Sequence, residues 1–162
     1  MANKYLTKLL VVLGCTLFCF AGLKAQEAET ETETAVTNMI KEKNFTFIAV
    51  NFSTPSLGAS QLTDYYSIKV KKDSIIGSLP YFGTSYTPQI NLTNDGIKFT
   101  STKYDYKLVE KKNGKYLITI RTKDDGISLQ SMFFTIFSNG KAQLDVTIRN
   151  RESMTFYGYI SQ

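Results

Sequence analysis

The side chains that most enzymes use for chemistry are scarce in this sequence. Histidine is absent from all 162 residues, and both cysteines, Cys15 and Cys19, lie near the N-terminus. These counts argue against a Ser-His-Asp triad, a thiol nucleophile and a zinc site of the usual kind. Glycoside hydrolysis needs only two suitably spaced carboxylates and remains open. The candidate carboxylates, most of them in predicted turns or on outward strand faces, are Asp64, Asp73, Asp105, Asp124, Asp125 and Asp145.

Motifs for cofactors and metals are also missing. The sequence contains neither a G-x-G-x-x-G fingerprint nor a phosphate-binding loop ending in Gly-Lys. Asp124-Asp125-Gly126 offers oxygen ligands, but the remaining positions of a calcium-binding EF-hand loop are not there. We therefore expect a turn at this place, and we predict no cofactor and no metal.

Aromatic side chains are the positive feature of the composition, with ten tyrosines and eleven phenylalanines but no tryptophan. Ligand sites are commonly apolar and aromatic with a few placed polar groups. We expect the aromatic side chains to line a rim or groove, with Tyr104, Tyr106 and Tyr159 as further members; the alternative is that they pack the sheet. The residues predicted to bind a ligand are Tyr81, Phe82, Tyr86, Arg151 and Tyr157.

The first 25 residues have the pattern of a secretory signal peptide. Lys4 and Lys8 precede an apolar run over residues 9–21, and small residues follow it. The run is shorter than the roughly 20 residues that a membrane-spanning helix needs, so we predict no transmembrane segment in the mature chain. A lipoprotein cleavage site at Cys15 is the minority alternative. Three of the 19 basic residues and none of the 14 acidic ones lie in this segment, so its removal lowers the net charge from +5 to +2.

The remaining 137 residues are enough for one domain. Residues 26–34 alternate Glu and Thr and predict a solvated acidic spacer. From Thr34 to Lys43, helical spacing of apolar residues predicts one short amphipathic helix. We expect a single β-rich domain over residues 35–162. Without a basic block, the chain has little support for binding nucleic acid.

Alternating apolar residues predict strands through the rest of the chain. Residues 45–52 carry apolar side chains at both odd and even positions, which predicts a strand covered on both faces, with the helix as one candidate cover. Residues 53–62 read as the longest loop. Turns are predicted at Asn94-Asp95-Gly96, Asn113-Gly114, Asp124-Asp125-Gly126 and Asn139-Gly140.

Eight to ten such strands without a long crossover predict an antiparallel meander. A meander must hide its inner face and protect its edges. We therefore predict a mainly β protein with a barrel-like or half-open barrel fold and the N-terminal helix as a plug. A β-sandwich is the alternative.

Residues 78–86, SLPYFGTSY, form the least generic passage. Pro80 fixes the backbone and Gly83 permits conformations that other residues avoid, so this segment predicts a chain reversal that aims Tyr81 and Phe82. With Asn150-Arg151 and the later Tyr157-Gly158-Tyr159-Ile160, the passage resembles domain-of-unknown-function family 4251, a family of exported Bacteroidetes proteins. The resemblance implies a periplasmic or outer-membrane-facing location and brings no activity.

These observations favour an exported, non-enzymatic binding or interaction domain with an aromatic-rich rim. Its partner would be a small apolar or glycan ligand, or an envelope protein. The alternatives are a structural partner of an envelope complex and, more remotely, a carboxylate-dependent glycosidase.

Overall fold

The structure is a computed structural model of the whole chain, and it describes residues 31–84, 96–126 and 128–162. The predicted signal peptide, the first five residues of the acidic spacer, Tyr86 and two residues of the Asn94-Asp95-Gly96 turn lie outside these ranges. Within the described ranges, no helical segment has the length and hydrophobicity that a membrane crossing requires.

A helix over residues 31–42 precedes the sheet. It begins before Thr34, so the described end of the predicted spacer is helical. It ends at Lys43, whose φ of 54° lets the next amide, Asn44 N–H, donate back to the Met39 carbonyl. Val36 and Ile40 are buried in the core. Burial of this apolar stripe explains why the helix forms here.

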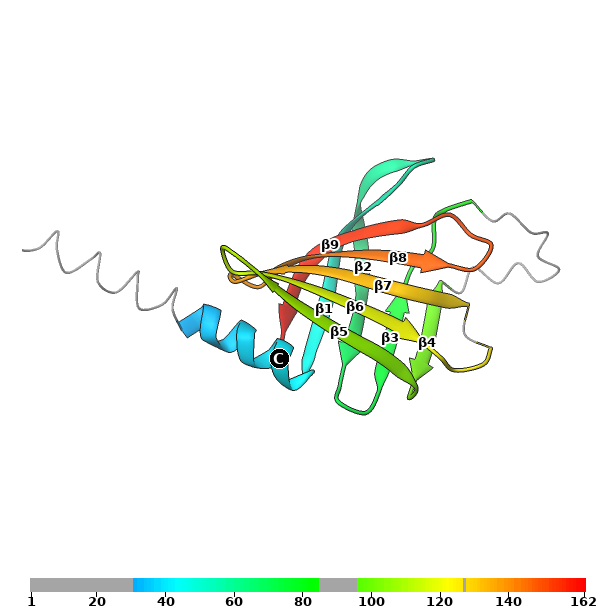
Figure 1. Cartoon of the computed structure of the whole chain (residues 1–162). Helices are drawn as coiled ribbons and strands as arrows, with labels where there is room; N and C mark the ends of the chain where they lie inside the picture. The colour runs from blue at the N-terminus through cyan, green and yellow to red at the C-terminus, as the bar shows by residue number, and fades with distance from the viewer. Residues whose placement is uncertain (1–30, 85–95, 127) are drawn as a thin grey trace, which may run out of the picture.

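Nine strands form one sheet, and they account for most of the described chain (Figure 1). In chain order they are β1 (Phe45–Thr54), β2 (Gly58–Val70), β3 (Ile75–Leu79), β4 (Ile97–Ser101), β5 (Tyr104–Lys111), β6 (Lys115–Thr122), β7 (Leu129–Phe137), β8 (Lys141–Ile148) and β9 (Met154–Ser161). Their order in the sheet is β4-β3-β2-β1-β9-β8-β7-β6-β5.

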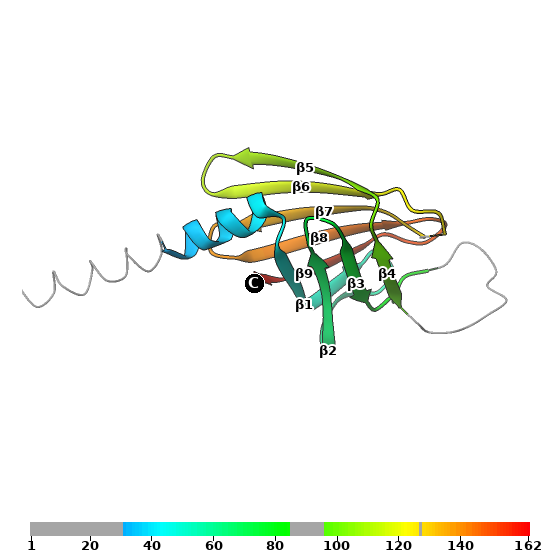
Figure 2. The same cartoon turned by 90° about the horizontal axis from the view of Figure 1, so that it is seen from below.

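The sheet curls into a nearly closed barrel. Figure 1 shows β5 to β9 running side by side while β2, β3 and β4 cross them at a steep angle, and Figure 2 shows the helix at the barrel end where β1 begins. The first and last strands, β1 and β9, pair along most of their length. At Gly158 the two backbones approach so closely that a Cβ atom would collide with the Ile48 carbonyl oxygen. The prediction of a barrel-like antiparallel fold with one short helix is confirmed.

The barrel keeps one seam, between β4 and β5, for a topological reason. All neighbouring strands are antiparallel, and nine is an odd number, so the two end strands β4 and β5 run in the same direction. Two strands that follow each other in the chain can pair in parallel only through a long crossover connection. Here Thr102 and Lys103 alone separate the two strands. The predicted continuous meander is therefore interrupted at this point, where the chain passes directly from one sheet edge to the other.

β4 and β5 are not paired by backbone hydrogen bonds, and side chains stabilise the joint between them instead. The Asp124 carboxylate accepts hydrogen bonds from the Ser101 hydroxyl at 2.5 Å and from the Lys103 backbone N–H at 3.2 Å. These bonds, the Ser101 hydroxyl first, hold the pKa of Asp124 below its ordinary value. On β5, the Tyr106 hydroxyl donates to the Ile40 carbonyl at 2.9 Å and ties the seam to the helix.

The interior of the barrel is filled by apolar side chains. Phe45, Phe47, Phe134 and Phe156 are its largest fully buried members, and Phe134 meets both Phe45 and Phe47 edge to face. Such aromatic pairs add to the stabilisation from burial.

Two expectations for β1 and β2 are wrong. The outer face of β1 is covered only at its start, where Thr46 is buried; Val50 is exposed, and a bulge between Ala49 and Asn51 turns Phe52 inward. The predicted loop at residues 53–62 is mostly strand, with a turn of three residues between Thr54 and Gly58. Residues 58–61 are all exposed and carry no apolar alternation that could reveal a strand.

Candidate functional site

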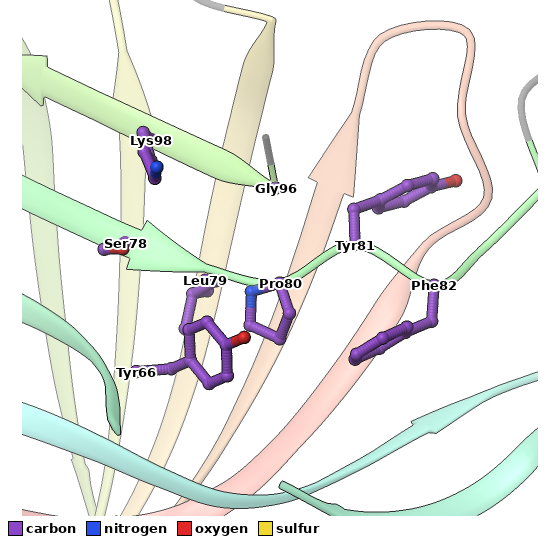
Figure 3. Close-up of a pocket in the computed structure, with 8 residues that line it drawn as sticks. All are labelled: Tyr66, Ser78, Leu79, Pro80, Tyr81, Phe82, Gly96 and Lys98. Carbon is purple, nitrogen blue, oxygen red and sulfur yellow. The ribbon is translucent and has the colours of Figure 1, made fainter. Parts of the chain in front are cut away.

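The segment after β3 lies at the barrel end that is away from the helix. Pro80 ends the strand, and the next two side chains diverge, with the Tyr81 and Phe82 rings pointing to different sides of the backbone (Figure 3). The Phe82 ring stacks on Phe52, with ring centroids 4.4 Å apart and an interplanar angle of 24°. Phe82 therefore covers the bulged part of β1. We call this end of the barrel, with residues 80–84, the β1–β2 turn and the β8–β9 connection, the rim.

Tyr81 joins this segment to the β8–β9 connection. Its hydroxyl donates to the Thr84 carbonyl at 2.8 Å and to the Glu152 carbonyl at 3.3 Å. The Arg151 guanidinium lies 4.9 Å from the centre of the Tyr81 ring, within the range of a cation–π contact. This segment thus has a defined partner, the β8–β9 connection, while the chain reversal predicted for residues 78–86 falls partly outside the described residues.

Glu152 is the polar centre of the rim. Only 7% of its surface is exposed, and its carboxylate accepts three hydrogen bonds, from the Ser56 N–H at 2.9 Å, the Ser56 hydroxyl at 2.7 Å and the Thr84 N–H at 2.8 Å. The Thr84 N–H bond and then the Ser56 hydroxyl hold the pKa of Glu152 below its ordinary value, against the opposite effect of burial. One ionised side chain therefore clamps three segments that are far apart in the sequence.

A pocket of about 290 Å³ opens beside this clamp (Figure 3). Three aromatic rings, a proline and a lysine surround it; its lining residues are Tyr66, Ser78, Leu79, Pro80, Tyr81, Phe82, Gly96 and Lys98. A second pocket, of about 160 Å³, lies at the seam against the start of β4, the start of β7, the end of β8 and Arg151. Gly96 and Lys98 line both pockets, so the two adjoin at the start of β4.

The fold agrees with comparisons to known proteins. The family model described as Domain of unknown function (DUF4251) matches residues 27–160. The chain belongs to this family. The crystal structure of a DUF4251 family protein from Bacteroides eggerthii is similar, with a TM-score of 0.61 and 18% sequence identity, over 83% of this chain and 90% of that chain. At this identity the likeness shows the fold alone. No curated protein matches the sequence.

The structure brings together three of the five residues predicted to bind a ligand in this DUF4251 protein. Tyr81, Phe82 and Arg151 meet at the rim, whereas Tyr86 lies outside the described residues. Tyr157 is on the outer face of β9, where it pairs with Gln143 of β8, and it lines neither pocket. Of the further aromatic candidates, Tyr104 and Tyr106 lie on β5 at the seam.

Sequence reasoning missed several residues that complete the rim of this chain. Glu152, Phe52, Tyr66 and Lys98 come from four different segments, and no local motif marks any of them. Glu152 in particular is a single acidic residue after a predicted strand. Only the fold brings it to Ser56 and Thr84, which lie 96 and 68 positions earlier.

Several of the predicted turns are present in this DUF4251 chain, and two of the candidate carboxylates make hydrogen bonds within the protein. Positive φ angles of 61°, 84° and 81° at Gly114, Gly126 and Gly140 accompany the turns predicted there. Asp124 secures the β4–β5 joint, and Asp145 accepts hydrogen bonds from Gln143 and Thr155 on the outer face. Among the described residues, no group of three or more acidic side chains is arranged to hold a metal ion.

The outer face of the barrel exposes a second group of aromatic side chains. They flank β8, whose outward residues Lys141, Gln143 and Asp145 are polar. We call this group the outer aromatic patch; its members are Phe133, Phe137, Tyr157 and Tyr159. Aromatic groups on an exposed face are a common mark of interaction surfaces.

Proposed function

We propose that this DUF4251 chain is an exported, non-enzymatic binding domain whose ligand lies in the rim pocket. The observation that supports this most is the pocket itself, which is lined by the aromatic residues Tyr66, Tyr81 and Phe82 and also by Lys98. An apolar, aromatic lining with a few polar groups is typical of small-molecule sites. Because apolar side chains fill the barrel interior, we propose the rim pocket as the ligand site.

The pocket has a rigid support on one side. Phe82 is stacked on the buried Phe52, and Tyr81 is hydrogen-bonded to the segment that carries Glu152. A wall held in this way loses little conformational freedom when a ligand arrives, which favours binding.

Export rests on the N-terminal sequence. We propose that residues 1–25 are a signal peptide and that the mature protein is periplasmic or associated with the outer membrane. Lipid attachment at Cys15 is the alternative route to the same membrane.

The proposal is tested by screening the purified protein against lipids, glycans and peptides with native mass spectrometry and thermal shift. We expect at least one class to bind and raise the melting temperature. Phe82→Ala should raise the dissociation constant of that ligand by about fivefold or more, because the substitution removes one aromatic wall of the pocket. Phe133→Ala is the matched control, since Phe133 is 40% exposed and Phe82 43% exposed, but Phe133 lies on the outer face. A screen without any binding ends the small-ligand proposal.

A second candidate function is that of a structural partner in an envelope complex. The outer aromatic patch favours it, because a protein partner would cover these side chains. A carboxylate-dependent glycosidase gains no such support, since no Asp or Glu is among the described residues that line either pocket.

A further inference from the structure

We infer that the rim site binds a small organic acid, a molecule with an aromatic or other apolar body and one anionic group. This inference rests on the proposed function of the rim pocket and names the chemical class of its ligand. It follows from the charges, the sizes and the positions of the two adjoining pockets.

The apolar part of the ligand has a defined place. In the larger pocket, the Tyr66 ring lies beside Leu79 and Pro80, and Phe82 closes the other side (Figure 3). Flat aromatic faces and a proline ring favour a planar or aliphatic group over a highly hydrated one.

Among the described residues that line the pockets, the charged ones are all positive. Lys98 lines both pockets, and Arg151 lines the smaller one while its guanidinium lies over Tyr81, which lines the larger one. No aspartate or glutamate is among the residues described as lining either pocket. An acidic group at the start of β4 would therefore be attracted from two sides, whereas a cationic ligand would be repelled.

The carboxylates of the rim and of the β4–β5 joint do not line these pockets in the described lining. Glu152 directs its oxygens at Ser56 and Thr84, and Asp124 directs its oxygens at Ser101 and Lys103. Each of them is engaged by donors of the protein's own chain. A ligand anion therefore meets Lys98 without a carboxylate between them in the described lining.

The volumes limit the ligand to a small molecule. A dry cavity of about 150 Å³ is known to accept one benzene molecule. The smaller pocket, at about 160 Å³, thus has room for about one ring, and the larger one, at about 290 Å³, for about two. The site fits an acid with one or two rings or an equivalent aliphatic chain.

The test measures binding of matched acids and amides by two-dimensional NMR of the full-length, ¹⁵N-labelled protein. The probes are 4-phenylbutyrate, 2-naphthylacetate and decanoate, each beside its primary amide, which has nearly the same shape without the charge. Phenyl phosphate is added to distinguish a preference for phosphate from one for carboxylate. We expect the acids to shift the amide signals of Ser78, Phe82, Gly96 and Lys98 and to bind about fivefold to tenfold more tightly than the amides.

Two substitutions at Lys98 separate charge from shape. Lys98→Met keeps a long side chain without the amine and should remove most of the preference for acids, with little effect on the amides. Lys98→Arg should retain the preference. Lys107→Met is the matched control, because Lys107 is exposed on β5 and lines neither pocket.

The possible outcomes distinguish the two proposals. Amides that bind the wild-type protein as tightly as acids would overturn the inference about charge and leave the rim pocket as a binding site. An acid preference that persists in Lys98→Met would also overturn it. If neither acids nor amides shift the rim signals, this inference is overturned, and the separate screen against lipids, glycans and peptides decides the proposed function of the pocket.

Discussion

At the scale of single residues, Glu152 determines the shape of the rim. It is buried and ionised, a combination that is costly unless hydrogen bonds replace the lost water. Ser56 and Thr84 supply those bonds from two other segments. The carboxylate therefore links the β1–β2 turn to the segment that carries Tyr81 and Phe82, and its charge state should affect the stability of the whole barrel end.

We predict that Glu152→Gln lowers the melting temperature by several degrees at pH 7 and that this difference shrinks in acid. The pKa of Glu152 is lowered in the folded state. Its ionised form therefore stabilises the fold above the ordinary glutamate pKa of about 4.3, and this stabilisation is lost as the pH falls through the lower folded-state value. Thermal unfolding of both proteins from pH 7 to pH 3 measures the effect.

Glu110→Gln is the control for this prediction, because Glu110 is exposed on β5. It should leave the melting temperature nearly unchanged throughout the pH range. A difference between wild type and Glu152→Gln that stays constant down to pH 3 would show that the carboxylate charge does not stabilise the rim.

At the scale of elements, the sequence predicts strands best where one face alone is buried. In β8, Ala142, Leu144, Val146 and Ile148 are all buried and the residues between them are not, as their alternation predicts. In β1, apolar residues at odd and even positions suggested two covered faces. The bulge between Ala49 and Asn51 shifts the alternation by one residue, so that Phe52 faces inward like Phe47. No local signal in the sequence distinguishes such a bulge from a second covered face.

The rim could be predicted in part for a similar reason. Pro80 marks the end of β3 through its own backbone preference, so the sequence places Tyr81 and Phe82 just beyond a strand, whereas Gly83 is not among the described glycines with a positive φ. The partners of these residues, Phe52 and Glu152, are set by tertiary contacts between distant segments. A sequence pattern of local origin contains no information on such contacts.

The β4–β5 joint allows an element-scale prediction. Because β4 has a hydrogen-bonded neighbour on one side only, Asp124 is expected to limit its opening. We predict that Asp124→Ala increases hydrogen exchange severalfold at the amides of β4 and the first residues of β5, while amides of β7, β8 and β9 keep their protection. Exchange measured by NMR at pH 7 resolves these groups.

Asp125→Ala provides the comparison, since Asp125 is exposed and adjacent in sequence. It should leave exchange in β4 unchanged. Equal exchange in β4 for the wild-type protein and Asp124→Ala would mean that the seam does not depend on this carboxylate.

At the scale of the whole molecule, the barrel presents two aromatic surfaces with different chemistry. The rim is concave, includes Lys98 and Arg151, and suits a small molecule. The outer aromatic patch lies on the side of the sheet, across three adjacent strands. Neighbouring strands are about 4.8 Å apart, so the two aromatic rows on β7 and β9 are separated by about 10 Å. A surface of that width suits a protein partner better than a single small ligand.

The envelope-partner function therefore makes a prediction that concerns the outer aromatic patch. A photoreactive phenylalanine analogue placed at Phe137 or Tyr159, in the cell that produces the protein, should form a crosslinked species of one discrete mass. The same analogue at Tyr65 is the control, because Tyr65 is a more exposed aromatic residue, at 70%, and lies on β2, outside the patch. Crosslinks at the patch and none at Tyr65 would support a specific partner. Free monomer alone, or the same products at all three positions, would contradict this function and leave the rim as the surface on which binding depends.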